Sequence, residues 1–225
     1  LKDVEEDLVA AGLKKIGKLY VQGVLKHKID RPTARDGLAR LSTSTQTNNL
    51  QNKDIVIEAI VEKLDVKQKV LGDLEEQVSS NCIIASNTSA LSITEMSKGL
   101  KYPDRFVGIH FFNPVHQMKL VEIVRGEKTS DITVQRAIKF VQSIGKLPVV
   151  VKDSPGFVVN RILIPYLVKA VEMTYDHPPA FIDAAMVDFG MPMGPFRLMD
   201  EIGLDVCTHV AWDICDRLNI DCSGM

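Results

Sequence analysis

The chain has 225 residues, enough for one or two domains that bury a sizeable core. Its 45% hydrophobic and 25% charged residues are ordinary for a globular protein, and a formal net charge of −2 offers no basic surface to nucleic acid or an anionic membrane. The four cysteines show no C-x-x-C spacing, which argues against a zinc or dithiol site and is typical of a reduced intracellular protein. No apolar run is long enough to span a bilayer, so we expect no membrane insertion.

The first two thirds of the chain alternate helical patterns with short apolar runs. Helices are expected at 4–28, 66–78, 93–100 and 131–145, and strands at 40–43, 54–60, 82–86, 106–112, 120–124 and 147–153. A turn is expected near 27–31, after Gly23 and a basic segment. Nearly all-apolar strands that alternate with helices are typical of a mostly parallel α/β sheet covered on both faces.

The composition changes after Asp153, where Pro155 and Gly156 mark a boundary. Helices are expected at 158–175, with Pro165 inside, at 181–190, with Gly190 as its cap, and at 198–218, with a break at Gly203. The pattern therefore predicts two domains, an α/β domain at 1–153 and an all-helical domain at 154–225.

Two titratable residues stand out because they lie in apolar strands. His110 lies near the end of the run FVGIHFF, and Glu122 lies in the middle of LVEIV. A carboxylate buried in such a strand costs several kcal/mol, about 3 or more, unless a partner compensates its charge. An imidazole is a suitable partner, and a His–Glu pair is a general-base arrangement. Taken alone, His110 is better explained as a core histidine bonded to a backbone carbonyl.

Several segments together resemble the 3-hydroxyacyl-CoA dehydrogenase family. The matching segments are IEAIVEKLDVKQ (57–68), ASNTSALSI (85–93), GIHFFNPVHQMKLVEIVRG (108–126), KDSPGFVVNRILIPYL (152–167) and FGMPMGPFRLMDEIGLD (189–205). They occur in the family's order and at its spacing, and agreement of five segments is far more specific than one. The resemblance implies a Rossmann-like NAD-binding domain at 1–153 and a helical domain for substrate binding or dimerisation at 154–225.

The resemblance also implies roles for individual residues. It makes His110 the catalytic base and Glu122 its carboxylate partner, with Ser89 and Asn160 near the substrate's 3-oxygen. The residues implied to bind NAD are Asp3 at the adenosine ribose and, around the nicotinamide, Glu62, Lys67, Asn87 and Asn113. Lys26 falls near a position that meets CoA phosphates. No metal is implied.

Plainer explanations remain open for several of these residues. Ser89 is also consistent with a cap for a helix that starts at Leu91, and Asn113 with a turn residue before Pro114. Glu62 and Lys67 are also consistent with an exposed pair at a helix start. The early lysines around Lys26 are consistent with a solvated helix face as well as with a surface for an anionic CoA tail.

The sequence departs from the family at its beginning. A dinucleotide-binding domain normally begins with a strand, the turn G-x-G-x-x-G and a helix, yet no two of the 14 glycines are two residues apart. We therefore expect an N-terminally truncated Rossmann-like sheet that lacks its first strand and Gly-rich loop, and an incomplete helical domain. Because that helix start normally binds the pyrophosphate, we expect the chain by itself to bind NAD poorly.

The function implied is the oxidation of (S)-3-hydroxyacyl-CoA to 3-oxoacyl-CoA with NAD, in fatty-acid β-oxidation. FGMPMGPFRLMDEIGLDV favours a multifunctional parent over a stand-alone enzyme. Two alternatives remain: a catalytically idle fragment that binds acyl-CoA or serves in assembly, and a dehydrogenase of a small 3-hydroxy acid. The expected partners are the acyl-CoA substrate and either a second copy or a larger multifunctional complex, without nucleic acid. The expected compartment is the bacterial cytoplasm, with mitochondria and peroxisomes as alternatives.

Overall fold

The computed structural model describes residues 1–225 except 48–49, 205–206, 209–210, 213, 215 and 217–225. The chain divides into two compact units. Unit 1 comprises Leu1–Lys53 and Gln77–Ser80, and unit 2 comprises Asp54–Glu76 and Asn81–Met225. These bounds differ from the two domains expected from the sequence, 1–153 and 154–225, and that division stays a prediction. Within the described part of the chain, no helix combines the length and the apolar character that crossing a bilayer requires.

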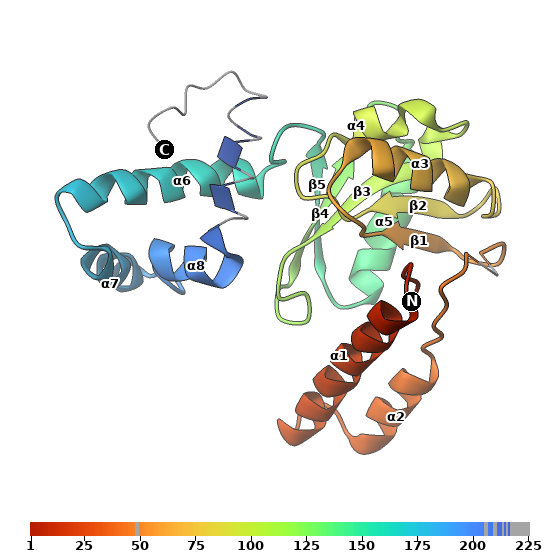
Figure 1. The fold of residues 1–225 in the computed structure, drawn as a ribbon, viewed down its shortest axis with the longest axis horizontal. Coiled ribbons are helices and arrows are strands. Elements are labelled where there is room, and N and C mark those ends of the chain that lie inside the picture. The colour runs from red at the N-terminus through yellow and green to blue at the C-terminus, as the bar shows by residue number, and fades with distance from the viewer. Residues whose placement is uncertain (48–49, 205–206, 209–210, 213, 215, 217–225) are drawn as a thin grey trace. The chain divides into compact units, whose positions relative to one another are not determined.

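Unit 1 is built on two helices, α1 (Glu6–Leu25) and α2 (Arg31–Ala39), which pack against each other (Figure 1). The predicted first helix and the turn after it are confirmed, but α2 was not predicted. Its start carries a recognisable signal, because the Asp30 side chain accepts a hydrogen bond of 2.8 Å from Thr33 N and Pro32 follows in the first turn. Gly37 lets the helices approach, since a Cβ there would overlap the Tyr20 ring.

The strand predicted at 40–43 is wrong. The chain leaves α2 there and makes only an isolated parallel bridge between Lys2 and Ser44, supported by a 2.7 Å bond from the Leu1 amino group to Ser42 O.

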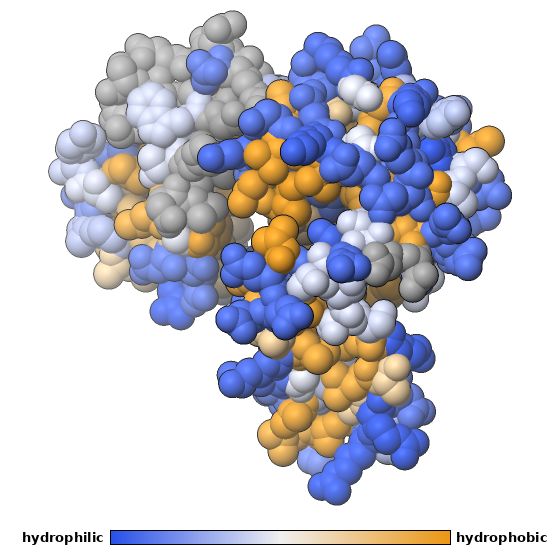
Figure 2. Space-filling model, turned by 45° about the vertical axis from the view of Figure 1, so that its right-hand side comes forward, coloured by the Kyte–Doolittle hydropathy of each residue, from blue (hydrophilic) through white to orange (hydrophobic). Residues whose placement is uncertain are grey.

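Hydrophobic side chains lie on the face of unit 1 that Figure 2 shows. The exposed apolar residues of α1 are Leu8, Leu13, Leu19, Val21 and Leu25.

Unit 2 contains a five-stranded sheet in chain order, β1 to β5. The strands are β1 (Ile55–Glu58), β2 (Ile83–Ser86), β3 (Phe106–Phe111), β4 (Leu120–Arg125) and β5 (Leu147–Lys152). All pairs are parallel except β3–β4, which is antiparallel. The prediction of a mostly parallel, Rossmann-like sheet followed by helices is confirmed.

Helices cover both faces of this sheet (Figure 1). Val134, Ala137 and Val141 of α5 (Asp131–Ser143) form one core with alternate residues of β2, β3 and β4, which include Ala85 and Ile109. The other face packs against α3 (Leu64–Glu75) and the short α4 (Ile93–Met96), which continues into a 3₁₀ turn at Ser97–Gly99. A second 3₁₀ turn, Pro103–Arg105, leads into β3.

The described residues of unit 2 that follow β5 are mainly helical, as predicted. Its elements are α6 (Val159–Glu172), the 3₁₀ turn Met173–Tyr175, α7 (Pro179–Phe189) and α8 (Pro195–Ile202). Pro165 lies inside α6, and Gly190 ends α7 with φ of 113°, a left-handed conformation that glycine adopts readily. The helix predicted at 198–218 is interrupted at Gly203, and much of its remainder, including Cys215, lies outside the described residues, as does Cys222.

The close approach of β3 to its neighbours requires a glycine at position 108. A Cβ there would lie 2.7 Å from Val124 Cβ and 2.9 Å from two side-chain carbons of Ile93. We expect Gly108→Ala to lower the free energy of unfolding by about 1–3 kcal/mol through overpacking. Gly72→Ala in α3, where a Cβ meets nothing within 4 Å, is expected to raise it by about 0.5–1 kcal/mol. Urea denaturation measures both, and equal stability of the two variants would contradict this account.

Candidate active site

The centre of the site is a buried pair formed by His110 and Glu122. The two residues lie directly opposite each other in the antiparallel β3–β4 ladder. His110 Nδ1 is 2.8 Å from Glu122 Oε2, and the residues are 4% and 1% exposed. In such a ladder, opposite side chains point to the same face of the sheet, so the pairing register makes the contact. The contact expected between the two side chains is therefore present in the structure.

The second carboxylate oxygen of Glu122 is held by the start of α6. Glu122 Oε1 accepts bonds of 2.9 Å from the backbone N–H groups of Val158 and of Val159. Gly156 and Phe157 precede them with φ of 68° and 51°, and this left-handed segment turns the chain into the helix. Burial raises the pKa of Glu122, but the bonds from His110, Val159 and Val158 outweigh burial and hold the pKa below its usual value.

These contacts define the state of the His110 ring. An ionised Glu122 only accepts hydrogen bonds, so the proton between the two residues lies on His110 Nδ1. In a neutral ring, Nε2 then carries the free electron pair and is the atom that can take a proton. Phe112 and Phe157 pack on the ring, with centroid distances of 4.5 and 5.7 Å. The pair is therefore an oriented base in a largely apolar surrounding.

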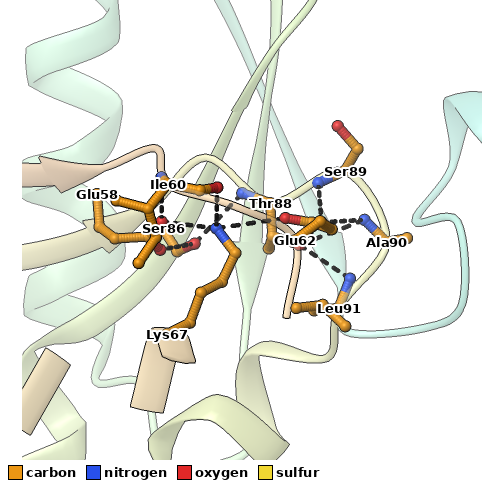
Figure 3. A network of polar contacts seen from close by, with 9 residues as sticks. All are labelled: Glu58, Ile60, Glu62, Lys67, Ser86, Thr88, Ser89, Ala90 and Leu91. Atoms are coloured by element: carbon orange, nitrogen blue, oxygen red, sulfur yellow. Dashed lines mark hydrogen bonds and ion pairs between the residues drawn. The ribbon is translucent and has the colours of Figure 1, made fainter. Parts of the chain in front are cut away.

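Ser89 and Asn160 are brought together from distant parts of the chain. Asn160 Nδ2, near the start of α6, donates a 3.3 Å hydrogen bond to the backbone oxygen of Ser89. The alternative that Ser89 caps the following helix is wrong, because Ser92 caps α4 by accepting from Glu95 N at 3.1 Å. The Ser89 hydroxyl points away from the Glu62 carboxylate (Figure 3).

Glu62 and Lys67 belong to a charged network at the end of β1 (Figure 3). Lys67 Nζ lies 2.6 Å from Glu58 Oε1 and 3.3 Å from Glu62 Oε2, and its side chain is 1% exposed. The alternative of an exposed pair at a helix start is therefore wrong for Lys67. Glu62 Oε1 accepts from the Thr88 hydroxyl and from Ser89 N at 3.0 Å. Burial raises the pKa of Glu62. The hydrogen bond from Thr88, the charge of Lys67 and the hydrogen bond from Ser89 N together lower it by more, so the pKa lies below its usual value.

The two predicted asparagines differ in their contacts. Asn87, directly after β2, accepts a 3.0 Å hydrogen bond from Phe111 N with its Oδ1 and so ties the end of β3 to the end of β2. Asn113 is exposed and precedes Pro114 through a cis peptide bond.

Asp3 and Lys26 lie in unit 1. Asp3 is exposed and accepts a 2.7 Å hydrogen bond from Val4 N, and Lys26 is the exposed residue that ends α1. Their implied contacts with the adenosine ribose and with CoA phosphates stay predictions.

Glu58, Ser86 and Thr88 also belong to this network, and they were not predicted from the sequence. A signal for Glu58 was present, since it is a carboxylate in the apolar run DIVIEAI, as Glu122 is in LVEIV. It accepts from Ser86 Oγ at 2.6 Å in addition to Lys67. Ser86 is the last residue of β2 and carried no comparable signal.

The donor set at this edge of the sheet fits the nicotinamide half of NAD. Glu62, Asn87 and Asn113 follow the carboxyl ends of β1, β2 and β3, the edge at which open α/β sheets bind their ligands. A carboxylate that is partly exposed, with Glu62 at 32%, can accept from ribose hydroxyls, and amide side chains can pair with a carboxamide.

The lowered pKa values of Glu62 and Glu122 predict the acid limit of stability. A carboxylate whose folded pKa lies below the unfolded value of about 4.3 stabilises the fold above that pH and loses this contribution as the pH falls through the folded value. We expect the free energy of unfolding, measured with urea, to fall steeply below about pH 4.3. Glu122→Gln should flatten that slope, and an unchanged slope would contradict the assignment.

The chain matches two family models. Residues 1–154 match the NAD binding domain of 3-hydroxyacyl-CoA dehydrogenase, and residues 156–221 match the C-terminal domain of 3-hydroxyacyl-CoA dehydrogenase. The fatty acid oxidation complex subunit alpha of Idiomarina loihiensis is 42% identical over 212 residues, which cover 93% of this chain and 29% of that protein. Its counterpart in Acinetobacter baylyi is 42% identical over 230 residues, which cover 100% of this chain and 32% of that protein. The chain thus spans about a third of the length of these curated relatives.

Solved structures agree with the family models. The 3-hydroxybutyryl-CoA dehydrogenase of Escherichia coli superposes with a TM-score of 0.94 at 35% identity, covering 99% of this chain and 48% of that one. The (S)-3-hydroxybutyryl-CoA dehydrogenase PaaH1 of Ralstonia eutropha gives a TM-score of 0.92 at 39% identity, covering 96% and 78%. With both family models matched in order over almost the entire sequence, the chain belongs to the 3-hydroxyacyl-CoA dehydrogenase family.

Proposed function

We propose that this chain carries the site that oxidises (S)-3-hydroxyacyl-CoA to 3-oxoacyl-CoA with NAD. The observation that carries the proposal is the buried contact of 2.8 Å between His110 Nδ1 and Glu122 Oε2, which leaves Nε2 as the only ring nitrogen able to take a proton. Family membership supports the reaction class, and the two solved relatives from Escherichia coli and Ralstonia eutropha are named as 3-hydroxybutyryl-CoA dehydrogenases.

In the oxidative direction, His110 Nε2 removes the proton of the 3-hydroxyl group while the C3–H bond breaks and the C3=O bond forms. When bound, NAD supplies the acceptor for the hydride that leaves C3. Glu122 keeps the ring in the required tautomer and stabilises the imidazolium that forms, because its carboxylate is fixed by two backbone N–H groups. The apolar packing of Phe157 against His110 excludes water from the pair.

Ser89 and Asn160 have supporting roles in this proposal. The Ser89 hydroxyl points away from the Glu62 network and is free to contact the 3-oxygen (Figure 3). Asn160 fixes the backbone of Ser89 through its 3.3 Å hydrogen bond and so holds the serine on the turn after β2. Hydrogen bonds at an oxygen whose charge changes during the reaction stabilise the transition state.

The larger setting follows from the relatives. They are named as alpha subunits of a fatty acid oxidation complex, and all those named here are bacterial. We propose that the intact gene product is a multifunctional β-oxidation protein in the bacterial cytoplasm, assembled as a homodimer or within a larger complex. Lys26 is proposed to meet the CoA phosphates.

The test compares substrates on the intact gene product. We expect NADH formation from 3-hydroxybutyryl-CoA and NAD, and much slower formation from free 3-hydroxybutyrate. Faster reaction with the free acid would favour the dehydrogenase of a small hydroxy acid. Calorimetric binding of acetoacetyl-CoA without binding of NADH would favour the idle acyl-CoA-binding alternative.

A further inference from the structure

Glu58 is a buried acid for which the mechanism above has no use. Its side chain is 1% exposed, yet both oxygens have partners. Oε1 accepts from Ile60 N at 2.7 Å and from Lys67 Nζ at 2.6 Å, and Oε2 accepts from Ser86 Oγ at 2.6 Å. A buried ion pair adds little to stability compared with apolar residues of similar volume, so stability alone does not explain its presence.

Glu58 determines where Lys67 can lie. Lys67 is also 1% exposed, and its ammonium group donates to Glu58 Oε1, to Ile60 O at 3.1 Å and to Glu62. The Glu58 contact is the shortest of the three, at 2.6 Å compared with 3.1 and 3.3 Å. Glu58 therefore holds the ammonium group from its buried side. Glu62, whose side chain is 32% exposed, presents its carboxylate to solvent.

The same chain of contacts reaches the turn that carries Ser89. Glu62 Oε1 accepts from Ser89 N at 3.0 Å and from Ala90 N at 3.3 Å (Figure 3). Movement of Lys67 would thus disturb the Glu62 carboxylate and the backbone beside Ser89. The network also has a net charge of −1, because Glu58 and Glu62 each contribute a carboxylate and Lys67 contributes one ammonium group.

We propose that Glu58 is a positioning residue that fixes Lys67 and Glu62, and that its charge strengthens binding of the oxidised dinucleotide relative to the reduced one. This inference rests on the proposed NAD-dependent function, with the partly exposed Glu62 carboxylate, at the carboxyl edge of the sheet, placed beside the nicotinamide half of the bound dinucleotide. The oxidised nicotinamide ring carries a positive charge and the reduced ring is neutral. A network with net negative charge therefore stabilises the oxidised form more, and the low-dielectric surroundings of Glu58 strengthen that effect.

The test measures dissociation constants of NAD and NADH by calorimetry on the intact gene product. Glu58→Gln keeps the size of the side chain and removes its charge. We expect the ratio of the NADH constant to the NAD constant to fall by about three- to tenfold. The matched control is Glu75→Gln, which alters a buried carboxylate that accepts from Lys101 N at 2.7 Å and Tyr102 N at 2.9 Å, without a contact to Lys67 among the described hydrogen bonds. It should leave the ratio unchanged.

A second variant separates charge from position. Glu58→Asp keeps the charge but withdraws it from Lys67 by one CH₂ group, so we expect weaker binding of both forms in parallel and an unchanged ratio. An unchanged ratio in Glu58→Gln, or unchanged affinities in Glu58→Asp, overturns the inference while the proposed function stands. Failure of the unsubstituted protein to bind either form overturns both.

Discussion

Replacing His110 with alanine is expected to lower kcat of the intact gene product by about 10²- to 10⁴-fold, the usual contribution of a positioned general base. The imidazole is the group that Glu122 orients, and its Nε2 is the only ring nitrogen left to accept a proton. Loss of the ring leaves the substrate hydroxyl to be deprotonated by water. Steady-state formation of NADH from 3-hydroxybutyryl-CoA measures the effect.

The matched control is His116→Ala. His116 is exposed on the segment between β3 and β4, and its ring nitrogen lies 3.2 Å from Gln117 Nε2. Its removal should change kcat by less than about twofold, because the residue takes no part in the proposed reaction. Calorimetric binding of acetoacetyl-CoA should persist in His110→Ala, because the loss is in the chemical step. Turnover of His110→Ala within tenfold of the unsubstituted protein would remove the basis for a histidine base.

Most of the fold could be predicted from local patterns. The strands of the sheet are short apolar runs such as CIIAS, with turn residues on either side, and α5 shows clear helical spacing. The prediction of a strand at 40–43 was wrong because a segment with so few apolar residues is equally typical of the chain that follows the end of a helix. The antiparallel direction of β4 was also not predictable, since an apolar run says nothing about which way a strand runs.

The site was predictable only in part. His110 and Glu122 could be paired because each is polar within an apolar run, and the structure places them opposite each other. The same signal marks Glu58, but its partner Lys67 lies in an amphipathic helix, where a lysine is ordinary, so this pair could not be predicted. The backbone N–H groups of Val158 and Val159 have no side-chain signature, so their bonds to Glu122 could come only from three-dimensional structure.

Glu122→Gln is expected to lower kcat by about 10²- to 10⁴-fold although it changes only one group of the side chain. The direction follows from the hydrogen bonds. The N–H groups of Val158 and Val159 both donate at 2.9 Å to one oxygen, so the glutamine must place its amide oxygen there. Its NH₂ group then faces His110 Nδ1.

That arrangement reverses the tautomer of His110. An NH₂ group only donates, so Nδ1 must accept and the ring proton moves to Nε2, the atom that should take the substrate's proton. The base is thus blocked while the packing of the pair is kept. The test measures kcat together with the affinity for acetoacetyl-CoA, which should stay within about threefold because the volume and the backbone bonds are preserved. Glu127→Gln, an exposed acid just after β4, is the matched control and should retain full turnover. If Glu122→Gln kept near-normal kcat, the carboxylate would not determine the tautomer of His110, and the proposed role of the pair would be wrong.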